Sequence, residues 1–363
     1  MGLQGVFWFS VFVIGYIYLG YPLLLAVWAR IAGQATSKAD IRSSRTWPSV
    51  SIIIAARNEA ARLSARITNL LQLNYSGPRE IIVVSDGSTD DTAEVLARFG
   101  RDVRVVEVPA GGKPLALNVG VQVASGDVLV FADARQQFSD NALVELVANF
   151  ADPRVGAVTG ELVIDSEHQA TDSTIGHGVG LYWTYEKWLR RNESAVWSTL
   201  GATGAIYALR RCLWRPLPPD TLLDDVLAPM RVVLSGHRIV FEERAHAYDR
   251  ASADAPTEAR RKIRTLAGNY QILAQEPRLL IPLSNPVWIQ YMSHKVGRLL
   301  VPWALVSTLV TSVALAPASW FFTIVLSAQT AFYLLAVVGA VLDVRARRAT
   351  GDFSRALPAM LEE

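Results

Sequence analysis

Cysteine is almost absent from this sequence, since only Cys212 occurs among its 363 residues. A single cysteine cannot form an intramolecular disulfide, and it supplies too few thiolates for a cysteine-based zinc or iron–sulfur site. No histidine stands in a motif that would make Cys212 a nucleophile, so a structural role is the simpler interpretation. The fold must therefore be held together by packing.

A strong excess of either charge is also missing, because the formal net charge is +2 at neutral pH. Such a chain lacks the broad basic field that attracts nucleic acid, so no nucleic-acid partner is expected. Charged residues make up 19% of the chain and hydrophobic residues 51%. Because the charges crowd the middle and the apolar residues crowd both ends, we predict two different solvent environments for one chain.

Two long stretches contain no charged residue. The first runs from Leu3 to Ala29, and about 20 apolar residues are enough to cross the hydrocarbon core as a helix. A cleaved signal peptide is the alternative, but it needs a basic residue before the apolar run, and none is present. The second stretch runs from Leu299 to Leu342 and is broken at Ala316–Ser319 by a turn signal. We predict one membrane helix within residues 1–30 and two within residues 299–343.

Basic residues flank all three predicted spans. They are Arg30, Lys38, Arg42 and Arg45 after the first, Lys295 and Arg298 before the second, and Arg345, Arg347 and Arg348 after the third. The positive-inside rule places these clusters in the cytoplasm and the N-terminus outside. The prediction is a multi-pass protein of the cytoplasmic membrane, in contact with the lipid bilayer, with its central region and a tail at residues 344–363 in the cytoplasm. Residues 279–292 are apolar but short and interrupted by prolines, so we expect an interfacial segment there.

Between residues 47 and 275, short β-rich runs alternate with amphipathic stretches, which is typical of strand-helix-strand units and a mainly parallel sheet. The fold class is therefore predicted to be α/β. The expected strands are Val50–Ala55, Glu80–Ser85, Val103–Val108 and Val128–Phe131, and the expected helices are Asn58–Leu71, Asp91–Phe99 and Asp140–Phe150. Asp91 with Glu94 three residues later has the spacing of a capping box at the second helix.

Polar triplets follow three of these strands: Arg57-Asn58-Glu59, Asp86-Gly87-Ser88 and Asp133-Ala134-Arg135. Any one of them alone is more often turn or cap chemistry. In open parallel sheets, however, ligands bind beyond the carboxyl ends of the strands, where loops vary without disturbing the sheet. Three triplets at one edge therefore indicate a ligand site.

An ordered series of motifs resembles the family 2 glycosyltransferases, which are inverting enzymes with the Rossmann-like GT-A fold. The likeness is greatest to their membrane-bound polysaccharide-synthase branch, and it extends from about Ser49 to Gln271. The motifs are AARNEA (55–60), VVSDGSTDDT (83–92), GGKPLALN (111–118), GDVLVFADAR (126–135), GATGAIYALRR (201–211), LLDDV (222–226) and RRKIRTLAGNYQ (260–271). The resemblance implies a hexosyltransferase-type enzyme that uses a nucleotide-sugar donor of the uridine type.

The resemblance assigns donor binding to the loops after the first strands. Asp86 matches the family residue that bonds the base and ribose, and Gly87 lets the backbone approach closely. An ordinary helix cap is the alternative for Asp86. The other implied members of the nucleotide pocket are Ala55, Arg57 and Glu59. Lys113 lies where similar proteins contact the donor, with a solvated surface lysine as the alternative.

The metal motif of the family is only half present. Asp133 matches the first aspartate of DxD, and the resemblance implies Mg²⁺ or Mn²⁺ there, but Arg135 replaces the second aspartate. A guanidinium group has no lone pair for a metal. Either Asp133 alone holds the ion, with phosphate oxygens and waters completing the shell, or Arg135 neutralises part of the diphosphate charge. We favour the first hypothesis.

Sugar transfer requires an acceptor hydroxyl to lose its proton while a nucleoside diphosphate departs, so a general base and a counter-charge are both needed. Asp224 and Asp225 resemble the acidic pair of the family, in which the second member is the catalytic base. The alternative is an acidic pair that stabilises the dipole of a helix beginning there. Thr203 and Gly204 lie where similar enzymes line the acceptor site.

A third motif is altered. Arg261 and Arg264 match the charged positions of the QxxRW motif, with Arg in place of Gln and Thr265 in place of Trp. Both arginines are expected to contact the donor diphosphate or to order the loop above it. The tryptophan is associated with the acceptor end of a growing polymer, so its replacement weakens the prediction of processive synthesis.

These features predict an inverting glycosyltransferase that moves a sugar to a polysaccharide or glycolipid acceptor, carbohydrate or lipid-linked, at the cytoplasmic membrane face. One alternative is a processive polysaccharide synthase that also exports its product. Another is a non-catalytic nucleotide-sugar-binding assembly subunit, which Arg135 and Thr265 would fit. The presence of Asp133 and the Asp224-Asp225 pair favours an enzyme. A small-molecule transporter is disfavoured because the spans lack charged pathway residues.

Overall fold

The computed structural model describes residues 2–33, 47–165, 174–250 and 255–349. The described chain forms two compact units. The larger unit extends from Tyr21 to Val296, and the smaller one combines the helix before Tyr21 with the helices after Val296. Lys38, Arg42 and Arg45, on which part of the predicted orientation depends, lie outside the described residues, as does most of the predicted tail.

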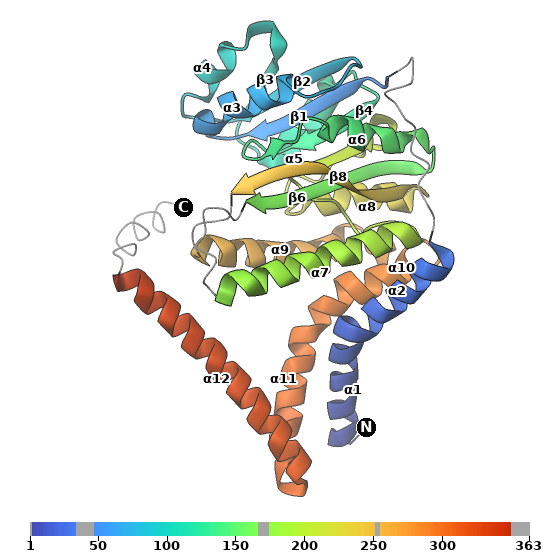
Figure 1. Ribbon diagram of the computed structural model, residues 1–363, viewed down its shortest axis with the longest axis vertical. Coiled ribbons are helices and arrows are strands. Elements are labelled where there is room, and N and C mark those ends of the chain that lie inside the picture. The colour runs from blue at the N-terminus through green and yellow to red at the C-terminus, as the bar shows by residue number, and fades with distance from the viewer. Residues whose placement is uncertain (1, 34–46, 166–173, 251–254, 350–363) are drawn as a thin grey trace. The chain divides into compact units, whose positions relative to one another are not determined.

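One half of the central sheet is parallel and lies where the sequence predicts it. Its strands are β1 (Val50–Ala56), β2 (Arg79–Asp86), β3 (Arg104–Val108) and β4 (Val128–Ala132). Their order is β3-β2-β1-β4, and every neighbouring pair runs parallel. All four carboxyl ends therefore meet at one edge of the sheet (Figure 1), as the site prediction requires.

The other half of the sheet is mixed, and the sequence did not reveal it. β7 (Ile206–Arg210) runs antiparallel to β4 and to β6 (Val155–Asp165), while β8 (Arg238–Arg250) pairs parallel with β6 and antiparallel with β5 (Gln137–Phe138). β8 contains charged residues over much of its length, so no clean apolar alternation marks it as a strand. The predicted α/β class is confirmed, and these pairs make the sheet mixed.

Helices cover both faces of the sheet (Figure 1), among them α3 (Ala60–Leu71), α4 (Thr92–Ala97), α5 (Lys113–Val123) and α6 (Ala142–Ala148), with the 3-10 turns η2 (Gly100–Asp102) and η3 (Asn149–Ala151). The capping-box prediction is wrong for α4. Asp91 precedes the helix but makes no side-chain capping bond. The Asp90 carboxylate caps it instead, because it accepts the Thr92 N–H at 3.1 Å and the Thr92 hydroxyl.

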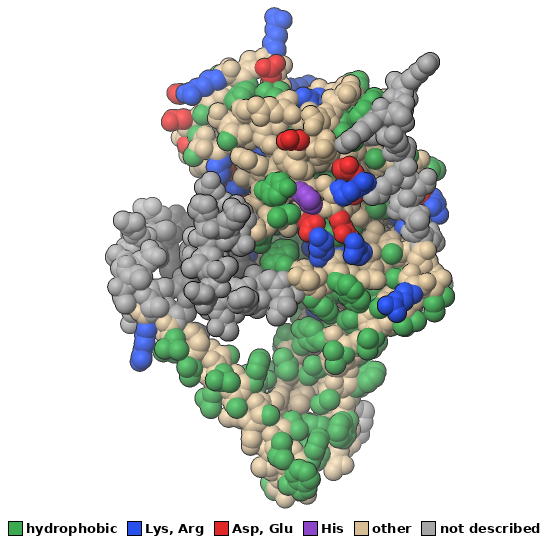
Figure 2. Space-filling model, viewed as in Figure 1, with side chains coloured by type: hydrophobic (Ala, Val, Ile, Leu, Met, Phe, Trp, Pro, Cys, Tyr) green, Lys and Arg blue, Asp and Glu red, His purple; other side chains and the backbone are tan. Residues whose placement is uncertain are grey.

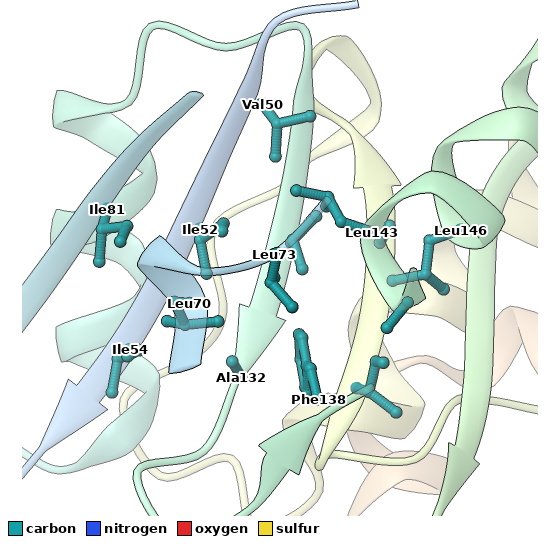
Figure 3. Close-up of a cluster of buried hydrophobic side chains, with 14 of the residues drawn as sticks. Val50, Ile52, Ile54, Leu70, Leu73, Ile81, Ala132, Phe138, Leu143 and Leu146 are labelled. Carbon is teal, nitrogen blue, oxygen red and sulfur yellow. The ribbon is translucent and has the colours of Figure 1, made fainter. Parts of the chain in front are cut away.

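Strand side chains alternate between two apolar cores. Ile52 and Ile54 point into the core under α3 and α6, together with Leu70 and Leu143 (Figure 3), whereas Ile53 points into the core under α5 and α8. All three isoleucines are fully buried. Each such side chain contributes about 1.5–3 kcal/mol through the hydrophobic effect. Burial on both faces explains why β1 is a continuous apolar run.

The remaining elements of the larger unit are mostly helical. They are α2 (Tyr21–Ala32), α7 (Thr174–Val196), η4 (Arg211–Leu213), α8 (Asp224–Leu234), α9 (Ala255–Gln275), η5 (Pro277–Leu280), α10 (Trp288–Gln290) and the π-helical turn η6 (Tyr291–Val296). α9 packs against the segment that leads into α8, since a Cβ at Gly268 would lie 2.5 Å from Leu223. α2 packs against α7.

The smaller unit contains α1 (Leu3–Gly15), the π-helical turn η1 (Tyr16–Gly20), α11 (Gly297–Leu315), η7 (Ala316–Ala318) and α12 (Trp320–Ala349). α1 packs on α11, and Phe7 joins Leu315 and Phe322 in a small core. Many other large apolar side chains of these helices are exposed (Figure 2). Three helical segments are long and apolar enough to cross a membrane, namely Leu3–Ala32, Trp288–Ala318 and Trp320–Gly339. The second of them includes the end of the predicted interfacial segment.

Candidate active site

Hydrogen bonds connect the loop after β1 to the loop after β2. Asn58 adopts a left-handed backbone, with φ of 54°, and its side-chain oxygen accepts the Thr89 N–H at 2.8 Å. The Glu59 N–H in turn donates to the Thr92 hydroxyl at 3.2 Å. This brings together the two loops predicted to bind the nucleotide. Arg57 is exposed beside them, and Ala55 and Glu59 are half-buried.

Asp86 braces the glycine turn that precedes α5. Its two carboxylate oxygens accept the backbone N–H groups of Gly111 at 2.7 Å and Gly112 at 2.9 Å. Gly87 has φ of 59°, and a Cβ there would lie 2.6 Å from Ala110, so the close approach of the two loops requires glycine. Each carboxylate oxygen still has room for a second donor. The geometry is therefore compatible with the predicted contact to a nucleotide, and it adds a structural role.

Lys113 stands between two carboxylates from different parts of the fold. At the start of α5, its Nζ lies 3.0 Å from Asp133 Oδ1 after β4 and 3.3 Å from Asp224 Oδ2 in α8. Burial alone would lower the pKa of Lys113, but the carboxylates of Asp224, Asp133 and Asp225 outweigh it and raise the pKa above its ordinary value. Lys113 is therefore a fixed cation within an acidic site, contrary to the alternative of a solvated surface lysine.

Asp225 is held by the loop that precedes β7. Its Oδ2 accepts the Gly204 N–H at 3.0 Å, and its backbone oxygen accepts the Ala202 N–H at 2.8 Å. Burial, together with the negative charge of Asp224, raises the pKa of Asp225 to about 6, while Lys113 and Lys295 oppose this rise. A carboxylate of this kind is mostly ionised at pH 7 and is a much better proton acceptor than an exposed aspartate.

The residues predicted to line the acceptor site lie in the same loop. Gly204 supplies the N–H that binds Asp225, and a Cβ at this position would lie 3.1 Å from the Asp225 carboxylate. The Thr203 N–H donates to the Thr159 hydroxyl of β6 at 2.9 Å. Both Thr203 and Gly204 are half-buried, so the loop that positions the carboxylate also borders the site around it.

Tyr207 is a residue that sequence reasoning missed. It is fully buried in β7 and stacks on Phe131 of β4, with ring centroids 4.6 Å apart. Its hydroxyl has no hydrogen-bond partner among the described residues. Burial, and then the charges of Asp224, Asp225 and Asp133, raise the pKa of Tyr207 well above its ordinary range. Nothing in the sequence marks Tyr207 as a neighbour of these carboxylates, because only the fold brings it close to them.

Arg135, at the altered position of the metal motif, is paired. Its Nη2 lies 2.5 Å from Oδ2 of Asp249, a buried carboxylate of β8 that also accepts a bond from Gln136 at 2.9 Å. In the described part of the chain, no group of three or more histidine, cysteine, aspartate or glutamate side chains is arranged to hold a metal ion. Asp133 itself offers one carboxylate oxygen beyond the one that faces Lys113, and its side chain is 38% exposed.

The two arginines of the altered QxxRW motif lie on α9 and are exposed. The Arg264 guanidinium donates to the Leu222 carbonyl at 3.2 Å, two residues before the acidic pair. Gln271 fixes the same segment, since its side-chain oxygen accepts the Leu222 N–H at 2.9 Å and its amide nitrogen donates to the Asp220 carbonyl at 2.8 Å. Through these hydrogen bonds, α9 fixes the position of the segment that precedes α8. Contact of Arg261 and Arg264 with a diphosphate remains a prediction.

The sheet order, with the acidic pair and the cation at the strand ends, is that of the GT-A fold. The same architecture occurs in the mannosyltransferase PcManGT from Pyrobaculum calidifontis, solved in complex with GDP-Man and Mn²⁺, with a TM-score of 0.69, 22% identity and 92% of both chains covered. Residues 51–212 match the family model of glycosyl transferase family 2, and this part of the chain is a domain of that family. The family resemblance inferred from the motifs is thus confirmed.

Two curated relatives are synthases. The chain is 24% identical over 235 residues to the poly-β-1,6-N-acetyl-D-glucosamine synthase of Staphylococcus epidermidis, covering 62% of this chain and 56% of that protein. It is 32% identical over 166 residues to the β-monoglucosyldiacylglycerol synthase of Nostoc sp., covering 44% of this chain and 34% of the relative. The chain therefore spans about half the length of the first relative and about a third of the length of the second.

Proposed function

We propose that this protein is an inverting glycosyltransferase that moves a sugar from a nucleotide-sugar donor to a lipid-linked or polysaccharide acceptor at the cytoplasmic face of the membrane. The proposal depends chiefly on one observation. Lys113 contacts Asp133 and Asp224 at the ends of different elements, and Asp225, with its raised pKa, is held beside them by the Gly204 N–H.

In this proposal Asp225 accepts the proton of the acceptor hydroxyl. The hydroxyl oxygen forms a bond to the anomeric carbon, and the bond from that carbon to the diphosphate oxygen breaks with its electron pair leaving on the diphosphate. Because a single displacement takes place, the configuration at the anomeric carbon inverts. A base with a pKa of about 6 combines a high ionised fraction at neutral pH with useful proton affinity.

The departing diphosphate needs positive charge beside it. Lys113 supplies one fixed cation, and Arg135 has further N–H groups besides the one paired with Asp249. Mg²⁺ or Mn²⁺, with Asp133 as its protein ligand, would add Lewis-acid stabilisation of the same oxygens. Arg57, Arg261 and Arg264 are proposed to contact the donor from the surrounding loops, with Asp86 and Gly87 at the nucleoside.

The acceptor class is supported by the printed names of the relatives, one of which makes a polysaccharide and the other a glycolipid. The three apolar helical segments support membrane anchoring, and their basic flanks support a cytoplasmic catalytic unit. A uridine-type donor remains the first choice from the motif resemblance. These assignments define the assay conditions.

The test is a transfer assay on the full chain, purified in lipid, with a panel of UDP-sugars and GDP-sugars. Each donor is offered with a membrane lipid extract, first in EDTA and then with Mg²⁺ or Mn²⁺ restored. We expect one donor to label a lipid or polysaccharide product in a metal-dependent manner. Nucleotide-sugar binding without turnover under every condition would overturn the enzyme proposal in favour of an assembly subunit. Products many sugars long would instead favour a processive synthase.

A further inference from the structure

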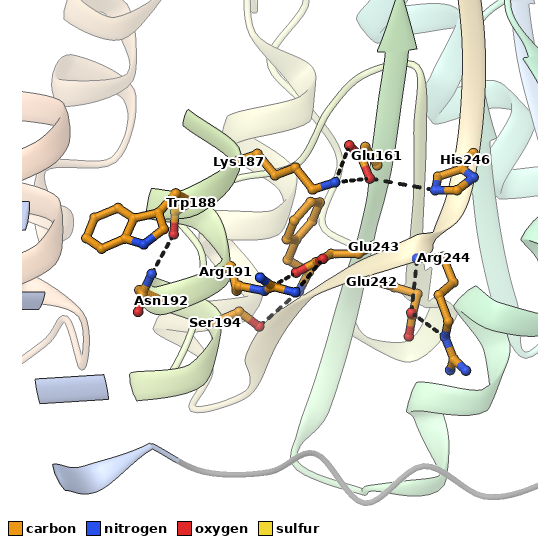
Figure 4. Close-up of polar contacts among 11 residues, drawn as sticks. Glu161, Lys187, Trp188, Arg191, Asn192, Ser194, Glu242, Glu243, Arg244 and His246 are labelled. Atoms are coloured by element: carbon orange, nitrogen blue, oxygen red, sulfur yellow. Dashed lines mark hydrogen bonds and ion pairs between the residues drawn. The ribbon is translucent and has the colours of Figure 1, made fainter. Parts of the chain in front are cut away.

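Four side chains of β6, β8 and α7 form a half-exposed cluster within the larger unit (Figure 4). Lys187 of α7 lies with Nζ 2.7 Å from Oε1 and 2.9 Å from Oε2 of Glu161 in β6. His246 of β8 lies with Nε2 3.7 Å from the same carboxylate, and its ring meets the Tyr248 ring edge-on, with centroids 6.0 Å apart. We call these four residues the Glu161 cluster. None of them takes part in the proposed displacement.

Glu161 belongs to the face of β6 that also borders the acidic site. Val158 and Leu162 both contact the core under α3 and α6, whereas Ala157 contacts the core under α5 and α8. Because side chains alternate along a strand, Thr159 and Glu161 point to the same side as Ala157. The register then pairs β6 with β8 so that Glu161 lies opposite His246 of the cluster.

This face connects the Glu161 cluster to the proposed base. The Thr159 hydroxyl accepts the Thr203 N–H at 2.9 Å, and the next residue, Gly204, donates its N–H to Asp225 at 3.0 Å. Glu161 follows Thr159 by two residues, which corresponds to about 6.6 Å along a strand. The cluster therefore lies close to the loop that positions Asp225, at a separation on the scale of a sugar unit.

The nucleotide loops lie on the other side of the acidic pair. In the sheet order β3-β2-β1-β4-β7-β6-β8, the proposed nucleotide residues follow β1 and β2, and Asp133 follows β4. β6 and β8 lie beyond β7, away from those loops. An acceptor whose hydroxyl faces Asp225 cannot extend across the bound donor, so the rest of the acceptor must extend over β6 and β8.

The chemistry of the Glu161 cluster suits a neutral sugar. The Tyr248 side chain is 44% exposed, and its hydroxyl has no hydrogen-bond partner within the described ranges. An exposed aromatic ring can pack against the apolar C–H face of a sugar, while the Glu161 oxygens accept from sugar hydroxyls and the third ammonium N–H of Lys187 donates to one. A central carboxylate disfavours phosphate, because like charges repel. We infer that the Glu161 cluster binds a neutral sugar unit of the acceptor and thereby orients the hydroxyl that faces Asp225.

This inference rests on the proposed function, because it names the chemical class of the acceptor of that site. The alternative is that Glu161 and Lys187 form only a surface ion pair that holds α7 on the sheet. The two explanations differ in a measurable way. Loss of a structural ion pair would lower thermal stability and leave sugar affinity unchanged, whereas loss of a binding residue would lower sugar affinity in a protein of nearly normal stability.

The experiment measures sugar binding by the full chain without donor, in a detergent that has no sugar head group. The neutral sugar probes are the disaccharides gentiobiose and chitobiose and a short-chain monoglucosyldiacylglycerol. Short-chain diacylglycerol and glucose 6-phosphate test for binding through the lipid or through a phosphate. Stronger binding of the glycolipid than of the disaccharides would support a lipid-borne sugar, and the reverse order would support the end of a polysaccharide.

Two substitutions test the cluster directly. Glu161→Gln should weaken the binding of the best sugar probe about tenfold, which corresponds to the loss of one charge-assisted hydrogen bond. Tyr248→Ala should weaken it about three- to tenfold, and Tyr248→Phe should bind nearly as well as wild type, because the ring remains. In the transfer assay, Glu161→Gln should raise the KM for the acceptor and leave kcat at saturating acceptor nearly unchanged.

Glu243→Gln is the matched control. Glu243 of β8 also pairs with a cation of α7, since its Oε1 contacts Arg191 (Figure 4), but it lies outside the Glu161 cluster. This variant should bind sugar as wild type does. Thermal unfolding in the same detergent identifies variants that fail to fold, and Lys187→Gln replaces Glu161→Gln if the latter is among them.

Several results would overturn the inference. They are failure of wild type to bind any sugar probe, equal binding by Glu161→Gln and Tyr248→Ala, and an equal loss in Glu243→Gln. Diacylglycerol binding as tight as that of its glucosyl derivative, or glucose 6-phosphate binding as tight as that of the disaccharides, would refute the neutral sugar as the ligand. Sugar binding that depends on Glu161 and Tyr248, without transfer from any donor, would instead refute the proposed function alone.

Discussion

Replacing Asp225 by asparagine should have opposite effects on activity and stability. Burial, together with the charge of Asp224, raises the pKa of the Asp225 carboxylate from the ordinary aspartate value of 3.8 to about 6. This rise corresponds to about 3 kcal/mol by which the folded protein disfavours the charged form. Asparagine removes the charge and retains an oxygen that can accept the Gly204 N–H.

The sign of the pH dependence follows from the direction of the shift. Since the folded-state pKa is raised above the unfolded value, the folded state binds the extra proton, and stability decreases as the pH rises from about 4 to about 6. Above pH 6, Asp225 is ionised and the folded protein bears the full free-energy cost of that buried charge. Asp225→Asn should therefore stabilise the protein by up to about 3 kcal/mol at pH 8, with a gain that fades towards pH 4. Transfer should fall about 10²- to 10⁴-fold, because the general base is lost.

Thermal unfolding of the full chain in detergent at pH 4 to 8 measures the stability, and the transfer assay measures the turnover. Asp224→Asn removes the adjacent charge but keeps the proposed base. Because Asp224 raises the pKa of Asp225, this variant should move the acid limb of the rate profile to lower pH. Transfer by Asp225→Asn within tenfold of wild type would show that Asp225 is not the base, whatever its stability.

Three further outcomes follow from named contacts. Lys113→Met leaves the Asp133 and Asp224 carboxylates without their shared cation. Donor affinity measured by calorimetry should therefore fall about tenfold or more, and the affinity of Lys113→Arg should be intermediate. Unchanged donor affinity would show that Lys113 does not belong to the donor site. Gly87→Ala forces a Cβ to 2.6 Å from Ala110 at positive φ and should destabilise the protein by about 1–3 kcal/mol in thermal unfolding. Arg135→Ala should lower stability, because among the described residues it leaves the buried Asp249 carboxylate with Gln136 as its side-chain partner. Turnover of this variant should still require a divalent ion, and turnover that survives EDTA but is lost in Arg135→Ala would refute the metal hypothesis.

Local patterns were enough to predict the parallel half of the sheet. β1, β2 and β4 are continuous apolar runs buried on both faces, and each ends in a polar triplet. The motif series was also enough to indicate the family, because its order and spacing are properties of the chain alone. The three helices that are long and apolar enough to cross a membrane were predictable for a similar reason, because a long run without charge is a property of the chain alone.

Pairing between distant segments was not predictable. β8 contains many charged residues. Side chains of β8 pair with Glu145 of α6, Arg191 of α7 and Glu161 of β6, so its strand character depends on neighbours that the sequence does not place side by side. Arg135 is an example at the site itself. From sequence it was only a departure from DxD, and the tertiary structure shows that a buried aspartate on β8 takes up its charge.

The sequence by itself determined the fold class and the residue types at the strand ends, because periodicity and motif spacing act over short distances along the chain. The tertiary structure decided which of those residues act together. It placed Lys113 between Asp133 and Asp224, and it let the Gly204 N–H donate a hydrogen bond to Asp225. It also brought Tyr207 and Lys295 near the same carboxylates. Charges interact through space over several ångströms, so the raised pKa of Asp225 is a property of the folded site and not of any motif.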